Sequence, residues 1–117
     1  MIDDFERGVL PERFDHAEHV RLTFLLIERY GEVDGLARLD RGLRELAGAR
    51  YHATITWAYG YAIADRMAAA PQDWATFRHA HPELLEPELG LLRRWYTRDR
   101  LFSDRARAAF VMPEKVA

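Results

Sequence analysis

The sequence predicts an all-α protein: a single-domain bundle of five or six helices that spans residues 1–117. Apolar residues recur at spacings of three and four along most of the chain, as they do on one face of a helix. No stretch shows the sustained alternation of apolar and polar residues that would indicate a strand. A chain of 117 residues is long enough to bury a core without disulfide bonds or structural metals.

The first two predicted helices follow each other closely. Asp15 can cap a largely buried helix over about His16–Tyr30, which Gly31 ends. The next helix ends near Gly48 and is amphipathic, with charged residues between the apolar positions Val33, Leu36, Leu39, Leu43 and Leu46. This apolar stripe can pack on the core or on a second copy of the chain, so a homodimer remains an open alternative.

The third predicted helix is the centre of the molecule and extends to about Ala69. It has no charged residue between Ala53 and Ala64, which predicts burial on all sides. Gly60 lies among aromatic residues, where the missing side chain would let another helix approach closely.

The sequence of the last third of the chain predicts shorter helices. Pro71 can occupy the first turn of a helix over about 71–80. A leucine-rich helix over about 84–96 is broken or started by Pro87. The last helix covers about 103–110, because serine followed by aspartate is a good helix start.

Composition excludes several classes of function. There is no cysteine, so disulfide scaffolds and thiol nucleophiles are excluded and a metal site would need nitrogen and oxygen ligands. A net charge of −2 lacks the basic excess of a nucleic-acid binder, and no glycine-rich phosphate loop or dinucleotide fingerprint indicates a nucleotide cofactor. The longest uncharged stretch is too short to span a bilayer, and the acidic start is unlike a signal peptide. We therefore expect a cytoplasmic protein without membrane or nucleic-acid partners.

Three histidines form the main candidate site. His16 and His19 lie three residues apart at a helix start, so both rings leave one face of the helix. His52 opens the central helix, and the three rings converge if the two helix starts are neighbours. In a chain without cysteine, three imidazoles predict a site for a divalent metal: zinc, iron, copper or nickel. Without metal, the same histidines could act as general acid and base, with Arg21 stabilising developing negative charge.

The segment around His52 departs from local helix preferences. The residues Thr54–Trp57 are poor helix formers at the start of a buried helix, and such conflicts gather at functional sites. Thr56 lies one turn after His52 and can orient a substrate from the same face. Tyr51, Thr56 and Tyr96 are therefore the candidate residues for binding a small-molecule substrate. The alternative is that the threonines cap the helix and the aromatic residues fill the core.

Several motifs carry a resemblance: Phe14-x-His16-x-x-His19-Val20-Arg21-Leu22, then Tyr51-His52-x-Thr54-x-Thr56-Trp57, then Tyr96-x-x-x-x-Leu101-x-Ser103-x-x-Ala106-Arg107 and Phe110-Val111-x-Pro113. In their order the chain resembles a family of small, uncharacterised bacterial all-helical proteins, and the similarity extends from Phe14 to Pro113. The resemblance implies that the three histidines act as one unit. It does not indicate which reaction, substrate or cofactor the family uses.

Two hypotheses from different classes follow. The first is a small all-α enzyme that acts on a small-molecule substrate at a histidine-lined pocket, with a divalent metal held by the three histidines. The second is a non-catalytic helical module that binds a small ligand or a partner protein. In the second hypothesis the histidines are structural residues whose hydrogen bonds fix helix packing.

Overall fold

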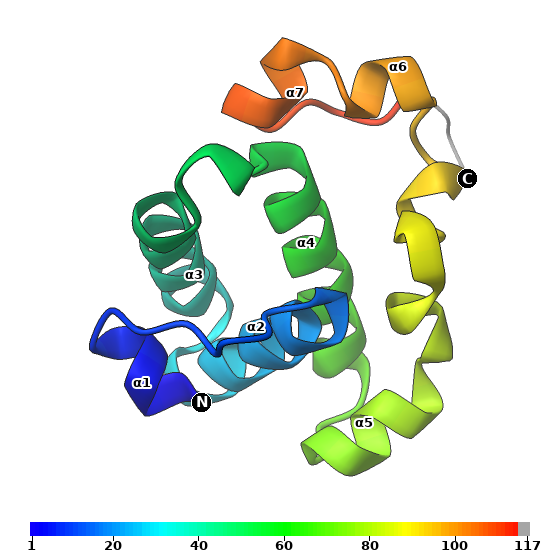
Figure 1. Ribbon diagram of the computed structural model, residues 1–117. Coiled ribbons are helices and arrows are strands. Elements are labelled where there is room, and N and C mark those ends of the chain that lie inside the picture. Colours follow the sequence, from blue (N-terminus) through cyan, green and yellow to red (C-terminus); the bar gives the residue numbers. More distant parts are fainter. Residues whose placement is uncertain (115–117) are drawn as a thin grey trace.

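The three longest helices of the computed structural model form the core together (Figure 1). They are α2 (His16–Tyr30), α3 (Glu32–Ala47) and α4 (Ala53–Ala69). The structure describes residues 1–114, and this part of the chain contains no strand, so the predicted all-α class is confirmed. No helix of the described residues is long and apolar enough to cross a membrane.

The remaining elements are short and lie mostly after α4. In chain order they are α1 (Ile2–Glu6), η1 (Gly48–Arg50), α5 (Trp74–Ala80), η2 (Pro82–Leu85), η3 (Pro87–Leu89), η4 (Leu92–Arg94), α6 (Arg98–Leu101) and α7 (Asp104–Ala108), where η marks a 3₁₀ helix. Figure 1 shows the chain passing from the lower end of α4 into α5 and then rising beside α4, so that α6 and α7 lie above the start of α4. Residues 1–114 thus contain seven α-helices, where the sequence predicted five or six.

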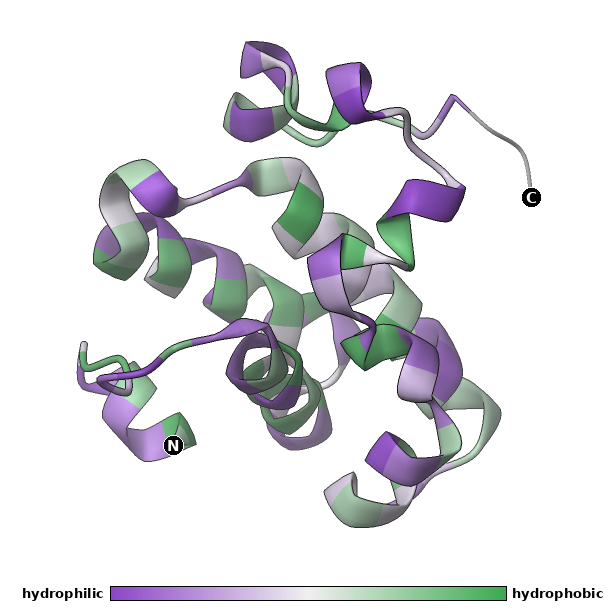
Figure 2. Cartoon of the chain, turned by 45° about the vertical axis from the view of Figure 1, so that its right-hand side comes forward, coloured by the Kyte–Doolittle hydropathy of each residue, from purple (hydrophilic) through white to green (hydrophobic). Residues whose placement is uncertain are grey.

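The predicted boundaries of α2 and α3 are confirmed. The Asp15 carboxylate accepts a hydrogen bond from the Glu18 amide at 3.0 Å, and Gly31 ends α2 with φ of 85°. Positive φ is strained for residues with a side chain, which explains the glycine there. Figure 2 shows hydrophilic and hydrophobic positions recurring along α3. Its buried residues include Leu36, Leu39 and Leu43, so the predicted stripe packs inside the chain.

The central helix α4 begins and ends as predicted. A Cβ atom at Gly60 would lie 2.7 Å from Cδ2 of Leu36, so the close approach of α3 expected at this glycine is confirmed. The Thr54 hydroxyl donates a hydrogen bond to the Ala109 carbonyl at 3.0 Å and accepts one from the Val111 amide at 3.1 Å. These two bonds bind the segment after α7 to the first turn of α4.

The helix predicted over about 84–96, broken or started by Pro87, is replaced in the structure by the three 3₁₀ turns η2, η3 and η4. Pro87 lacks an amide hydrogen and disfavours helical geometry in the residue before it. Glu86 is accordingly extended, with φ of −58° and ψ of 136°. Glu88 and Leu89 then adopt φ of 57° and 56°, which interrupts any continuous helix.

Two other predicted boundaries also differ. Pro71 lies outside α5, because Asp73 caps that helix by accepting a hydrogen bond from the Thr76 amide at 2.8 Å. The last helix begins after Ser103 as predicted but ends at Ala108, before the predicted end at 110.

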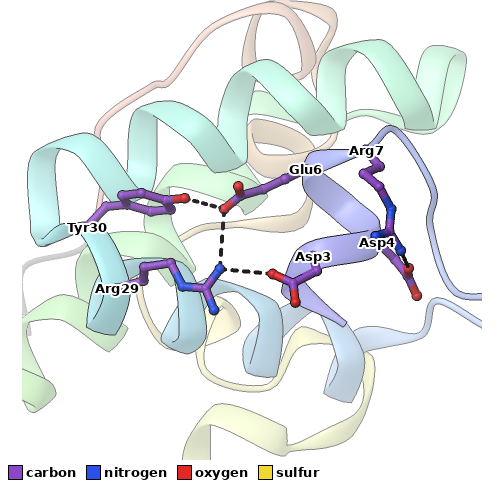
Figure 3. Close-up of polar contacts among 6 residues, drawn as sticks. All are labelled: Asp3, Asp4, Glu6, Arg7, Arg29 and Tyr30. Atoms are coloured by element: carbon purple, nitrogen blue, oxygen red, sulfur yellow. Dashed lines mark hydrogen bonds and ion pairs between the residues drawn. The ribbon is translucent and has the colours of Figure 1, made fainter.

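The short helix α1 was not predicted, and its position depends on α2 and α3. Arg29 Nη1 donates to Asp3 Oδ1 at 3.0 Å, and the Tyr30 hydroxyl donates to Glu6 Oε1 at 2.5 Å (Figure 3). The Phe5 ring fills the space that a side chain at Gly42 would occupy. These tertiary contacts hold a helix of five residues that would be unstable alone.

Candidate functional site

A cavity of about 270 Å³, here called the His19 pocket, lies where the start of α4 meets α2 and the end of α3. Four of its ten lining residues were predicted from the sequence, namely His19, Tyr51, His52 and Thr56. The other lining residues are Leu10, Phe14, Leu43, Ala47, Arg50 and Ile55. The pocket therefore has mainly apolar walls with a few polar groups, as small-molecule sites usually do.

Both ring nitrogens of His52 form hydrogen bonds with backbone groups of the chain. Nδ1 lies 3.1 Å from the Ile55 amide and caps α4, while Nε2 lies 2.8 Å from the Leu101 carbonyl. An amide can only donate and a carbonyl can only accept, so the neutral ring carries its proton on Nε2. Burial lowers the pKa of His52 and favours this neutral form. His52 thus has no nitrogen lone pair left for a metal.

His16 also bonds to the backbone of a distant segment. Its Nε2 lies 2.8 Å from the Leu84 carbonyl in η2, so this nitrogen is the donor. Its ring packs against the buried Tyr59 ring with centroids 4.6 Å apart. His16 does not line the His19 pocket, and its hydrogen bond connects the start of α2 to the leucine-rich segment.

His19 differs from the other two histidines. Its Nε2 is fully hidden and has no hydrogen-bond partner in the described part of the chain. Burial, and to a smaller extent the neighbouring His16, lower its pKa to about 4, so the ring is neutral near pH 7. The His16 and His19 ring centroids are 6.4 Å apart, as expected for neighbours on one helix face. His19 therefore lines the pocket and also carries a ring nitrogen that is hidden and has no partner in the described residues.

Tyr51 and Thr56 have different roles in the wall. The Tyr51 hydroxyl donates to Asp40, which also accepts a hydrogen bond from Trp57 Nε1 at 2.9 Å. Burial and the Asp40 carboxylate raise the pKa of Tyr51 far above its usual value, so its hydroxyl stays protonated and bonded. Thr56 is buried, and no hydrogen bond from its hydroxyl is found among residues 1–114. Of these two hydroxyl groups, the one of Thr56 is therefore available to hydrogen-bond a ligand.

The remaining candidates do not join this pocket. Tyr96 is buried, donates to the Val111 carbonyl at 2.7 Å and is absent from the pocket lining. Arg21 is exposed on α2 and is absent from the lining. Within the described residues, no three or more His, Asp or Glu side chains group in a way that could hold a metal ion. The expected group of three convergent histidine ligands is therefore not formed in this structure.

Sequence reasoning missed two residues of the site. Arg50 is exposed in η1 and lines the pocket, and no ion pair to it is found in the described chain. Asp40 fixes Tyr51 and Trp57 from α3, yet in the sequence it is one of several charges between the apolar positions of that helix. The position of Arg50 directly before Tyr51 was the available signal.

Comparisons with protein-family models, curated proteins and solved structures found no match to the chain. The resemblance of Phe14–Pro113 to a bacterial family accordingly stays a prediction. The function is therefore argued from the geometry of the site.

Proposed function

We propose that the protein is a helical module that binds a small ligand in the His19 pocket, with His16 and His52 as structural residues. The main support is how the three imidazoles are used. Both ring nitrogens of His52 form hydrogen bonds, to Ile55 and Leu101, and Nε2 of His16 forms one to Leu84. By contrast, Nε2 of His19 has no partner in the described residues, and His19 and Thr56 both line the cavity.

The pocket favours a compact and uncharged ligand. Its volume of about 270 Å³ is near the lower limit for small-molecule sites. A neutral imidazole and a hydroxyl can hydrogen-bond a carbonyl or alcohol, but they cannot offset the cost of burying a full charge. Arg50, the charged residue of the lining, is exposed, so water screens its charge and it offsets little of that cost. We infer a ligand with an aromatic or aliphatic body and one hydrogen-bonding group.

The proposal is tested by titrating ¹⁵N-labelled protein with uncharged aromatic alcohols, ketones and amides. The amide shifts of the Tyr51–Thr56 segment and of His19 are expected to move on binding. Thr56→Val keeps the shape but removes the hydroxyl, so it should weaken binding about fivefold, the value of one hydrogen bond. Thr76→Val, an exposed position on α5, is the matched control and should bind as the wild type does. Shifts confined to other regions, or equal affinity in Thr56→Val, would contradict the proposal.

The metalloenzyme is the competing candidate, and one observation favours it: Nε2 of His19 is buried without a partner. Buried unsatisfied groups are uncommon, and some mark unrecorded ions, waters or catalytic roles. A metal bound by all three histidines would have to break one of the two hydrogen bonds of His52, to the Ile55 amide or to the Leu101 carbonyl, whereas His16 could ligate through Nδ1 and keep its bond to Leu84. Such binding would require local rearrangement at the start of α4 or at α6.

Metal addition separates the two functions. Under our proposal, excess zinc, iron, copper or nickel should leave the melting temperature within about 1 °C of the untreated protein. A metal site predicts a rise that grows with metal concentration and disappears in His52→Ala. Near-stoichiometric metal in untagged protein by elemental analysis, lost in that variant, would replace our proposal with the metalloenzyme.

A further inference from the structure

A second and larger cavity, here called the α6 cavity, lies in the last third of the chain. Its volume is about 510 Å³, and its lining shares no residue with the His19 pocket. Leu89, Tyr96, Leu101 and Phe102 provide apolar surface, and Arg93 and Arg98 provide guanidinium groups. Glu88 adds one carboxylate to the lining, so the cavity combines an apolar floor with two positive charges and one negative charge.

The charge at this cavity is poorly neutralised by the protein. The exposed Arg98 side chain makes no ion pair or hydrogen bond that is found within residues 1–114. Arg93 has one contact, 3.6 Å to the Glu88 carboxylate, and both of these side chains are largely exposed. Such exposed pairs contribute little, so both guanidinium groups are available to an anion.

Thr97, a residue of the cavity lining, already binds a carboxylate from the chain itself. Glu114 accepts hydrogen bonds at 2.7 Å from both the amide and the hydroxyl of Thr97, which lines the cavity. These bonds lower the pKa of Glu114. Because both donors of Thr97 are occupied, Arg93 and Arg98 are the lining groups that can pair with an added carboxylate.

The backbone at the cavity is strained. Glu88 and Leu89 both have φ near +57°, in the left-handed region that residues with a side chain rarely adopt. Both residues line the cavity. Strained backbone of this kind persists where the surroundings fix it, and it gathers at ligand sites.

We propose that the α6 cavity binds a monoanionic molecule with an apolar body, of the aryl-carboxylate class. The acid group lies against Arg93 and Arg98, and the apolar body lies on Leu89, Tyr96 and Phe102. Phe102 is 47% exposed without a ligand, so binding would cover apolar surface that now faces water. This site is independent of the His19 pocket and of the function proposed for it.

The experiment uses two probes with the same ring system, 2-naphthoate and the uncharged 2-naphthylmethanol, titrated by calorimetry. The full chain should bind the carboxylate at least about fivefold more tightly than the alcohol, because only the carboxylate can pair with the two arginines. Arg98→Gln should remove most of this preference while leaving the affinity for the alcohol unchanged. Arg105→Gln, an exposed arginine of α7 outside the cavity, is the matched control.

Equal affinity for the two probes, or an Arg98→Gln variant that keeps the preference, would overturn the proposal. Thr56→Val provides an independent check, because it alters the His19 pocket alone. Weaker binding of 2-naphthoate to that variant would assign the probe to the other pocket and would also overturn the α6 site.

Discussion

Replacing His52 with alanine is expected to lower the free energy of unfolding by about 4 kcal/mol. The variant loses the cap on the Ile55 amide, leaves the Leu101 carbonyl without its donor and empties the volume of a buried ring. Each loss alone costs about 1 to 2 kcal/mol, and all three act at one position. Urea denaturation near neutral pH measures the difference directly.

Two further variants separate these contributions. The short side chain of His52→Asn can still accept from the Ile55 amide but cannot reach Leu101, so it should lose about 2 kcal/mol. His79→Ala changes an exposed histidine and should stay within about 0.5 kcal/mol of the wild type. If His52→Ala were as stable as His79→Ala, His52 could not be the structural residue described above.

Acidification is expected to destabilise the protein through His19. Its pKa is lowered to about 4 in the folded state, against 6.5 for an ordinary histidine. The unfolded chain therefore takes up the proton first, and the stabilising contribution is complete above pH 6.5 and is lost as the pH falls towards 4. Between about pH 7.5 and 4.5 this amounts to about 2.5 kcal/mol. The lowered pKa of His52 acts in the same direction.

Carboxylates titrate in the same range, so the contribution of His19 must be isolated by comparing variants. His19→Gln has no titrating group and should lose about 2 kcal/mol less than the wild type over this pH range. His79→Gln removes an exposed histidine and should retain the wild-type pH dependence. An identical pH dependence in His19→Gln and the wild type would show that the ring titrates normally in the folded protein.

Local signals in the sequence were sufficient for the long helices. Asp15 and Gly31 set the ends of α2 because capping depends on neighbouring residues alone. Local signals were less informative over 84–96, where leucine spacing predicted a helix broken or started by Pro87 and the structure has three 3₁₀ turns. The outcome there depends on Pro87 and on contacts far along the chain, such as the one from His16 to Leu84.

The candidate site was predicted in part for the same reason. Spacing indicates which side chains share a helix face, and His19, His52 and Thr56 do line one pocket. Spacing does not indicate which distant backbone group a ring will meet. His52 bonds to a carbonyl 49 residues later, and His16 to one 68 residues later. These two bonds favour structural roles over the metal ligation that residue types suggested.

The hydrogen bonds at the start of α4 also affect how the protein is made. During synthesis, His52 and Thr54 leave the ribosome 49 and 57 residues before Leu101 and Val111, their partners. Until those partners emerge, packing the first turn of α4 would bury polar groups that have no hydrogen-bond partner, and burying such groups is costly. The nascent chain should therefore remain open around α4 until residue 111 has left the ribosome. A truncated chain that stops before this point would be a preferred target of cellular proteases.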